Sequence, residues 1–226
     1  MNKPIIISLG GSLIFPEEID VKFLAQFKKL ILAQIKKGQR FILIAGGGKI
    51  CRKYQKALSE LTKIGATELD WMGIHTTHTN AQFIRLMFGQ LAHSQIVNDP
   101  TKHLNFKEKI LLAGGWVPGC STDRDAVLLA KTYGADTVIN LSNIDFLYDK
   151  DPRKFKNAKK ISTISWDGML KITGSKWIPG LNAPFDPTAA KLAKKFGLKV
   201  IIANGKNLNN LKNILDTKKF FGTKIE

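Results

Sequence analysis

Short runs of apolar residues alternate along the chain with longer segments in which apolar positions recur at helical spacing. The short runs are rich in β-branched residues and predict buried strands at 5–9, 41–45, 109–113, 137–141 and 199–203. The periodic segments predict amphipathic helices at 19–36, 49–63, 77–91, 123–133, 187–196 and 207–215. The polar region 150–180 predicts irregular structure with short helical pieces.

The order of these elements predicts an α/β fold with a mainly parallel central sheet that helices bury on both faces. No repeat, low-complexity segment or Pro/Ser-rich linker divides the sequence. We therefore expect one domain over residues 1–226, with an N-terminal lobe at about 1–135 and a C-terminal lobe at about 136–226. Sheets of this kind bind ligands at the carboxyl ends of their strands.

Glycine-rich or hydroxyl-bearing turns follow four of the predicted strands. These turns are Gly10-Gly11-Ser12, Gly46-Gly47-Gly48-Lys49, Gly114-Gly115 and Ser142-Asn143-Ile144-Asp145. Glycine lets a backbone approach a ligand closely, and the helix that follows presents free N–H groups that suit a phosphate. Lys49 and Arg52 add positive charge at the start of one such helix. One such turn by itself is often only a tight turn, but three at strand ends favour phosphate chemistry.

The chain of 226 residues carries 35 Lys and Arg against 18 Asp and Glu, a formal charge of +17, and its 44% hydrophobic residues supply material for a core. This charge permits nucleic-acid binding. The basic residues are scattered, however, mostly as pairs on amphipathic segments, without a basic tail or a basic stretch interleaved with aromatic residues. We therefore expect no dedicated nucleic-acid surface, and attribute the charge either to solvated helix faces or to the attraction of anionic phosphates.

Several common signatures are missing from the sequence. No G-x-x-x-x-G-K-[ST] occurs and no G-x-G-x-x-G opens the first helix, which argues against a P-loop kinase and a dinucleotide-binding dehydrogenase. His75, His78, Cys51 and Cys120 match no zinc-binding spacing. The two cysteines predict no disulfide framework, and no apolar run reaches the roughly 18 residues of a membrane span. We therefore expect a cytoplasmic protein that does not enter a membrane.

The segment from Gly114 to Asp123 combines small residues with hydroxyl groups and ends at a predicted helix start. Ser121, Thr122 and Asp123 are all residues that commonly cap helices. Asp123 therefore has two interpretations. It is a cap only, or its carboxylate orients cationic groups around a reacting phosphate.

Motifs along nearly the whole chain, taken in their order, resemble those of the amino-acid kinase superfamily, and within it those of the UMP kinases of archaeal type. The motifs are Gly10-Gly11-Ser12, Gly46-Gly47-Gly48-Lys49 with Arg52 and Tyr54, Asp70-Trp71-Met72-Gly73-Ile74, Asn80-Ala81, the segment from Pro118 to Asp123, Ser142-Asn143-Ile144-Asp145 with Tyr148 and Asp151-Pro152, Asp186-Pro187 before Ala189-Ala190-Lys191, and Gly222-Thr223-Lys224-Ile225. The resemblance implies a three-layer αβα sandwich like that of carbamate kinase. It also implies transfer of the ATP γ-phosphoryl group to the phosphate of UMP, with Mg²⁺ accompanying ATP, in a homo-oligomer that is a dimer or a hexamer.

The resemblance also assigns roles to individual residues. It implies UMP binding by Gly47, Asp70, Trp116, Val117, Pro118, Gly119, Cys120, Ser121 and Thr122, with Asp70 on the ribose hydroxyls. It implies ATP binding by Gly10, Gly11, Ser12, Gly48, Arg52, Ser142, Tyr148 and Asp151. It implies catalytic roles for Lys49, Arg52 and Asp123, of which Asp123 organises the basic groups near the transferred phosphoryl. No protein ligand for a metal is implied.

Two departures from the family pattern affect the phosphate contacts. Ser8 stands where many relatives carry a lysine before the first glycine pair, although archaeal UMP kinases also lack that lysine. Charge neutralisation then falls to Lys49, Arg52 or a later lysine such as Lys176. His78 stands where archaeal relatives tend to have arginine.

Two alternative functions stay open at this point. The first is a kinase of the same fold with another acceptor, since relatives phosphorylate carbamate, glutamate, aspartate, acetylglutamate or isopentenyl phosphate; Asp70 favours a ribose instead. The second is a non-catalytic nucleotide- or anion-binding protein, for which the absence of a lysine at Ser8 is the main support. The segment 176–185 departs from the family pattern and receives no role.

Overall fold

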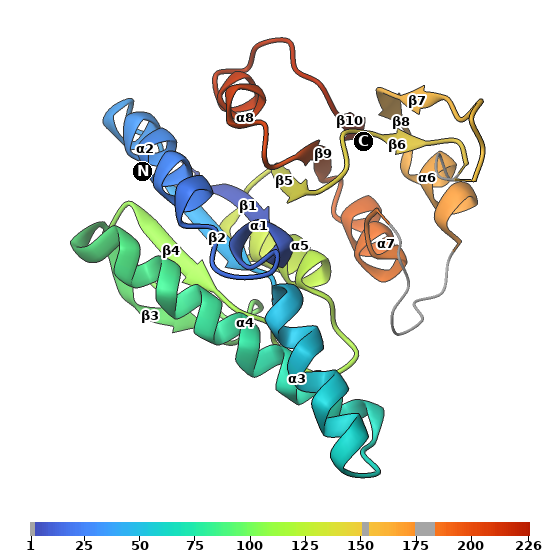
Figure 1. Cartoon of the computed structure of the whole chain (residues 1–226). Helices are drawn as coiled ribbons and strands as arrows, with labels where there is room; N and C mark the ends of the chain where they lie inside the picture. The colour runs from blue at the N-terminus through green and yellow to red at the C-terminus, as the bar shows by residue number, and fades with distance from the viewer. Residues whose placement is uncertain (1–2, 151–153, 175–183) are drawn as a thin grey trace.

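Within residues 3–150, 154–174 and 184–226, the part of the chain that the computed structural model describes, eight strands form one sheet in the order β3-β4-β2-β1-β5-β9-β10-β8 (Figure 1). The strands are β1 (Ile5–Leu9), β2 (Phe41–Ala45), β3 (Ala92–Val97), β4 (Ile110–Ala113), β5 (Thr137–Ser142), β8 (Thr163–Ile164), β9 (Lys199–Asn204) and β10 (Thr223–Ile225). All their pairings are parallel except that between β9 and β10. A separate antiparallel pair joins β6 (Leu147–Tyr148) to β7 (Lys160–Ile161).

Helices cover both faces of this sheet. They are α1 (Gly11–Ile14), α2 (Val21–Lys36), α3 (Gly48–Leu61), α4 (Ala66–Phe88), α5 (Thr122–Tyr133), α6 (Trp166–Thr173), α7 (Pro187–Lys195) and α8 (Leu208–Leu215), with a 3₁₀ turn at Gly89–Leu91. Alternate residues of β2 enter different cores: Ile42 and Ile44 pack with α5, α6 and α7, whereas Leu43 and Ala45 pack with α1, α2, α4 and α8. The predicted three-layer αβα sandwich is therefore confirmed.

The register of the sheet brings the carboxyl ends of five strands to one edge. Leu9 pairs with Ala45 on one side and with Leu141 on the other, so that β1 ends level with β2 and β5. The ends of β4 and β9 lie beside them, because β4 pairs with β2 and β9 pairs with β5 along matching registers. The turns singled out in the sequence therefore lie next to one another.

The structure differs from the predicted elements in the middle of the chain. Helix α4 begins at Ala66 and not at residue 77, and β3 follows it where no strand was predicted. The first turns of α4 contain Gly73 and half-exposed polar residues, so they lack a clear apolar stripe. Strand β3 lies at the edge of the sheet and has three non-buried polar residues, His93, Ser94 and Gln95, which hide the alternation of a strand.

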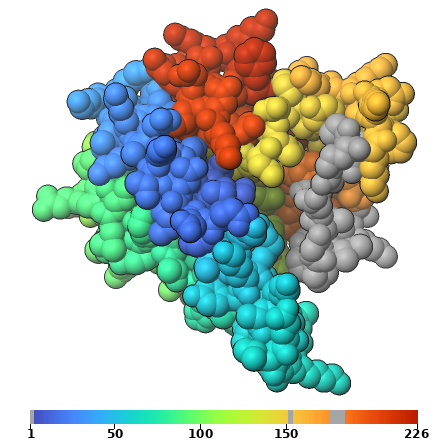
Figure 2. Space-filling view, viewed as in Figure 1, coloured from blue at the N-terminus to red at the C-terminus, as the bar shows by residue number. Residues whose placement is uncertain are grey.

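Helix α3 and the first turns of α4 project away from the rest of the molecule (Figures 1 and 2). Only Gly48 of α3 is buried, and the side chain of Leu61 at its end is largely exposed. In the described ranges, none of the helices combines the length and the apolar composition needed to cross a bilayer. Asp151 and positions 176–183 of the unassigned segment lie outside the described residues.

Candidate active site

The turns after β1 and β2 are interlocked at the level of the backbone. A Cβ atom on Gly11 would lie 2.6 Å from Cα of Gly48 and 2.7 Å from the carbonyl carbon of Gly46. Gly48 has a φ of +72°, a conformation that side chains rarely adopt. The amide of Lys49 donates to the carbonyl of Phe15 at 3.0 Å, so α3 starts directly beside α1. The two predicted phosphate-binding turns therefore form one surface of backbone atoms.

Helix α4 holds the tips of β2 and β4 through three polar side chains. The Asn80 side-chain amide, which is buried, donates to the carbonyls of Gly46 at 2.8 Å and Gly47 at 3.1 Å. Thr77 accepts a hydrogen bond from the Gly115 amide at 2.7 Å, and the His78 ring lies 2.9 Å from the Gly115 carbonyl through Nε2. These bonds fix the orientation of both glycine turns relative to the helix.

We expect Asn80→Ala to lower the free energy of unfolding by about 2 kcal/mol, because it leaves two glycine carbonyls without their donor. The same change should lower kcat/KM by roughly tenfold, because the turn loses its fixed orientation. Denaturant titration and steady-state kinetics measure the two effects. Thr79→Ala is the matched control, since this neighbouring hydroxyl is exposed and bonds only within the helix. Equal losses in both variants would contradict the positioning role of Asn80.

The loop after β4 is attached to α4 by Asp70. Its Oδ2 accepts a hydrogen bond from the Gly119 amide at 2.9 Å, and Gly119 has a φ of +77°. Further along the loop, the Cys120 thiol sulfur accepts from the Arg124 guanidinium at 2.8 Å. Asp70 and the loop 116–122, which the family resemblance both assigned to UMP, therefore lie together.

A cluster of carboxylates surrounds the start of α5. Asp123 accepts from the side-chain amide of Asn140 at 3.0 Å and from the backbone amide of Asp186 at 3.1 Å. The Ser121 hydroxyl donates to Asp186, which also caps α7 through Thr188. Ser121 is the N-cap of α5, so Asp123 is not the cap of this helix. Its carboxylate instead links α5 to β5 through Asn140 and to the start of α7 through the amide of Asp186.

Two carboxyl groups in this cluster have strongly raised pKa values. Desolvation is the main cause for both, and it raises the pKa of Asp123 and of Asp125 to about 7. The neighbouring Asp186 adds repulsion, while hydrogen bonds from the amides of Asp186 and Trp116 oppose the shift. Asp125 is fully buried, and its Oδ1 has no hydrogen-bond partner among the described residues. Ionised carboxylates are therefore destabilised here unless a positive group or a ligand approaches.

The cations nearest to the glycine turns gather around one carboxylate. Lys49 forms an ion pair with Glu17, and the charges of Lys53 and Arg52 act on the same group. The hydrogen bond from Lys49 is the largest of several effects that hold the pKa of Glu17 below its ordinary value. Lys49 and Arg52, the predicted catalytic cations, therefore lie at the start of α3 together with an exposed carboxylate. Lys176, the alternative cation, is outside the described residues.

Most of the predicted ATP contacts lie at the ends of β1 and β5 and at the start of α3. A Cβ atom on Gly10 would lie 2.7 Å from the Leu141 carbonyl oxygen and 3.6 Å from Cα of Ser142. At the tip of β9, next to that of β5, the Asn204 side-chain amide donates to Asp145 at 3.0 Å. Tyr148 lies in β6, in the small antiparallel pair, and Asp151 lies outside the described residues.

Sequence reasoning gave no role to Asn80, Asn140 or Asp125, although all three shape the site. All three are buried polar residues, but only Asn140 stands in an apolar run, whereas Asn80 and Asp125 have polar neighbours in α4 and α5. Buried polar groups in proteins are nearly always hydrogen-bonded, so such positions indicate a specific partner. The sequence carries this signal for Asn140 alone, and it does not identify the group that the side chain meets, which is the Asp123 carboxylate.

No group of three or more His, Cys, Asp or Glu side chains in the described ranges is arranged to hold a metal ion. His75 and His78 serve other contacts: His75 lies beside Trp71, and His78 lies against Gly114 and Gly115. Both cysteines are free.

The sequence of the chain is similar to those of known proteins. The model of the amino acid kinase family matches residues 3–204. A uridylate kinase of Thermoplasma volcanium is 36% identical over 230 residues, spanning 100% of this chain and 99% of that protein. A uridylate kinase of Thermococcus kodakarensis is 33% identical over 98% of this chain and 99% of that protein.

Solved structures agree with the sequence comparison. The crystal structure of uridylate kinase from Archaeoglobus fulgidus is similar with a TM-score of 0.83 and 29% identity, over 99% of this chain and 100% of that one. The UMP kinase of Bacillus anthracis, at 19% identity and a TM-score of 0.80, shares the fold. The chain therefore belongs to the amino acid kinase family.

Proposed function

We propose that this protein is a UMP kinase, which transfers the γ-phosphoryl group of ATP to the phosphate of UMP and releases UDP and ADP. Full-length similarity to archaeal uridylate kinases carries the proposal. The geometry supports it, because the glycine turns after β1, β2 and β4 lie at one edge of the sheet beside the carboxylate cluster of α5. We expect the enzyme to act in the cytoplasm, where thiols such as Cys51 and Cys120 stay reduced.

The two substrates would occupy the two halves of this edge. The N-terminal half, with Gly47, Asp70 and the loop from Trp116 to Thr122, would hold UMP. The C-terminal half, from about residue 136, would hold ATP beside Gly10, Ser12 and Ser142. The shared backbone surface of Gly11 and Gly48 lies between the two halves, where the transferred phosphoryl group must pass.

The chain contributes positioning and charge neutralisation, which dominate catalysis of phosphoryl transfer. The amides of the glycine turns would donate to phosphate oxygens, and Lys49 and Arg52 would offset negative charge at the start of α3. Asp123 is held by Asn140 and by the amide of Asp186, so it can orient a cationic group beside the phosphoryl. Mg²⁺ would enter with ATP and neutralise charge on the phosphates when bound.

The proposal is tested by measuring ADP release in a coupled assay with a panel of acceptors. We expect UMP to be strongly preferred over CMP, AMP, glutamate, carbamate and isopentenyl phosphate. Turnover with another acceptor but none with UMP would indicate a kinase of the same fold with a different substrate. Binding of UMP and ATP without any turnover would indicate a nucleotide-binding protein instead.

We expect Asp70→Asn to raise the KM for UMP by about tenfold, since it removes a charged acceptor that would face the ribose hydroxyls. The asparagine side chain keeps an oxygen for the Gly119 amide, so the loop should stay in place. Glu68→Gln is the matched control, because this carboxylate lies two residues earlier on an exposed part of α4. An unchanged KM in Asp70→Asn would point to an acceptor without ribose.

We also propose that the protein is a homo-oligomer, a dimer or a hexamer. Three exposed apolar side chains line one cavity of about 280 Å³: Ile19 from the segment before α2, Tyr54 from α3 and Phe83 from α4. Leu86 is exposed on the same helix as Phe83. Exposed apolar patches of this kind mark association surfaces.

We expect Phe83→Glu to lower the sedimentation mass below that of the wild-type oligomer, because a carboxylate would be buried unpaired in the contact. Phe221→Glu serves as the control, since Phe221 is exposed but does not line this cavity. An unchanged mass in Phe83→Glu would exclude this face as the contact.

A further inference from the structure

A continuous chain of hydrogen bonds crosses from the acceptor loop, Trp116 to Thr122, to the strand β5, and Asp186 lies at its centre. The Ser121 hydroxyl, near the end of the acceptor loop, donates to Oδ2 of Asp186. The backbone amide of Asp186 donates to the Asp123 carboxylate at 3.1 Å, and this carboxylate also accepts from the Asn140 side chain at 3.0 Å. Asn140 lies in β5, whose carboxyl end is proposed to hold ATP. The two proposed substrate sites are thus joined through the start of α7.

The Asp186 side chain is held in one orientation by its surroundings. It is buried, and its second oxygen, Oδ1, accepts from the Thr188 amide at 2.6 Å as the N-cap of α7. Helix α7 packs its buried residues into the same core as α5 and one face of the sheet, so its start has little freedom to shift alone. Because the two carboxylate oxygens serve two different elements, Ser121 and the start of α7 must move together.

The acceptor loop is attached to the rest of the site near both of its ends. The Ser121 oxygen accepts from the Arg124 amide at 3.3 Å as the N-cap of α5, and its single proton is given to Asp186. Earlier in the loop, the Gly119 amide donates to Asp70 at 2.9 Å. A nucleotide held between Asp70 and this loop would therefore also fix Ser121, and through it the Asp186 carboxylate.

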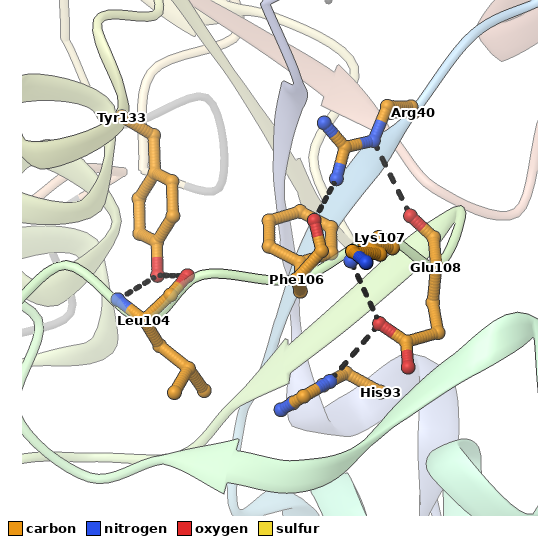
Figure 3. Close-up of polar contacts among 7 residues, drawn as sticks. All are labelled: Arg40, His93, Leu104, Phe106, Lys107, Glu108 and Tyr133. Carbon is orange, nitrogen blue, oxygen red and sulfur yellow. Dashed lines mark hydrogen bonds and ion pairs between the residues drawn. The ribbon is translucent and has the colours of Figure 1, made fainter.

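The polar contacts around Arg40, at the opposite edge of the sheet, differ from this chain of bonds in their reach (Figure 3). They connect residues of the N-terminal half alone: Arg40 with the carbonyls of Phe106 and Glu108, and Tyr133 with the backbone of Leu104. These bonds hold the loop before β4 in place within the half proposed to bind UMP. The bonds of Asp186 instead link that half to β5 and α7, which belong to the half proposed to bind ATP.

We propose that Asp186 is a positioning residue that couples the two substrate sites, so that UMP and ATP each bind more tightly in the presence of the other. The coupling rests on the proposed function, since it takes the acceptor loop as the UMP site and the end of β5 as part of the ATP site. A ligand that fixes Ser121 also fixes Asp186 and Asp123, so the second ligand meets a site that is already ordered. Couplings of this kind typically change affinity by about 5- to 150-fold, and they are reciprocal.

Isothermal titration calorimetry on the full-length protein measures this coupling. A non-hydrolysable ATP analogue is titrated into the free protein and into the protein saturated with UMP, and UMP is titrated with and without the analogue. We expect both affinities to rise by the same factor, about fivefold or more. A change that only weakens the fold lowers both affinities and leaves this factor unchanged, so the factor reports on positioning.

Asp186→Ser and Asp186→Asn separate the bond to Ser121 from the charge of Asp186. Serine still caps α7, but its side chain is shorter and leaves the Ser121 hydroxyl without its acceptor, so the coupling factor should fall to about 1. Asparagine also caps α7, and its amide can donate to the Ser121 oxygen in place of the lost bond. We therefore expect Asp186→Asn to keep the coupling factor within about twofold of the wild-type value.

Ser121→Ala removes the other end of the same bond. It should abolish the coupling as Asp186→Ser does, and the double variant should lose nothing further, because both changes delete one interaction. Asp20→Ser is the matched control: Asp20 caps α2 through the Phe23 amide, and its side chain accepts no other hydrogen bond from the described residues. The control should keep the wild-type coupling factor. Circular dichroism confirms that each variant is folded.

Independent binding of UMP and the ATP analogue to the wild-type protein would overturn the inference, as would a coupling factor that Asp186→Ser leaves unchanged. Equal losses in Asp186→Ser and Asp186→Asn would also overturn it, because the charge and not the bond would then carry the coupling. Failure of the UMP kinase assignment would show separately, as a lack of UMP binding and turnover. The same titrations with the acceptor found in the coupled assay would then still decide whether Asp186 couples the two sites.

Discussion

Gly11→Ala is expected to reduce kcat/KM for UMP phosphorylation by at least about 100-fold and to lower the free energy of unfolding by about 3 kcal/mol. The added methyl group would lie 2.6 Å from Cα of Gly48 and 2.7 Å from the carbonyl carbon of Gly46. Neither atom can move away as a flexible side chain would, since both belong to the backbone of the neighbouring turn. The variant must therefore separate the tips of β1 and β2, where both substrates are proposed to meet.

Thermal unfolding and steady-state kinetics measure the two effects of Gly11→Ala, with a Tm decrease of roughly 6–12 °C for a chain of this length. Gly38→Ala is the matched control. Gly38 has a φ of +89°, but a Cβ atom there would meet nothing within 4 Å. Its replacement should cost about 1 kcal/mol of backbone strain and leave kcat/KM unchanged. Wild-type activity in Gly11→Ala would show that the interlocked turns are not needed for phosphoryl transfer.

The sequence predicted the layers of the fold and the edge that carries the site. Continuous apolar runs such as Phe41–Ala45 are typical of strands buried on both faces, and glycines at their ends indicate where a backbone must approach closely. The same reasoning failed for β3, because an edge strand needs few apolar residues. It failed for the first turns of α4, because their role is to carry Asp70 towards the loop at Gly119 and not to fill a core.

The sequence also did not identify the hydrogen-bond partners of the buried polar side chains. Asn80 and Asp125 are buried and therefore need hydrogen-bond partners, but their polar neighbours in α4 and α5 hide that burial in the sequence. Their partners are the backbone of Gly46 and Gly47 and the amide of Trp116, which lie 9 to 34 residues away along the chain. Only the register of the sheet brings these groups together, and register depends on all the strands at once.

We expect the protein to become less stable as the pH rises, because of two carboxyl groups in α5. Asp123 and Asp125 have pKa values of about 7 in the folded protein, against an ordinary value of 3.8. Between these values the unfolded chain has released protons that the folded chain still binds, so stability falls as the pH increases. From about pH 5 to about pH 8 we expect the free energy of unfolding to fall by about 2–4 kcal/mol in the absence of ligands.

Other carboxyl groups act in the opposite direction and in a different pH range. Glu17 and Asp216 have lowered pKa values, mainly through hydrogen bonds from Lys49 and Lys37. Their contribution is lost only when the pH falls to about 4 or below, so it does not mask the decline above pH 5. Denaturant titration at several pH values measures the slope. A stability that is constant or rises from pH 5 to pH 8 would contradict the raised pKa values of Asp123 and Asp125.

Asp123→Asn should stabilise the protein at about pH 8 by about 1–2 kcal/mol and yet lower kcat by about 100-fold. The asparagine oxygen can accept from the Asp186 amide, and Asn140 can turn its own oxygen towards the new amide group, so the hydrogen bonds survive without the charge. The loss of activity follows because a neutral group no longer orients a cation beside the phosphoryl. Destabilised charges of this kind are typical of functional sites.

Asp125→Asn separates the two effects, because it removes an equally disfavoured charge that has no proposed contact with substrate. Its oxygen keeps the hydrogen bond from the Trp116 amide, and its other atom faces the position where Oδ1 already lacks a partner. We expect a similar gain in stability at about pH 8 and a change in kcat of less than about threefold. If both variants lost activity equally, the loss would come from the packing of α5 and not from the charge of Asp123. If Asp123→Asn kept its activity, the basic groups around the phosphoryl would be ordered by the substrates themselves.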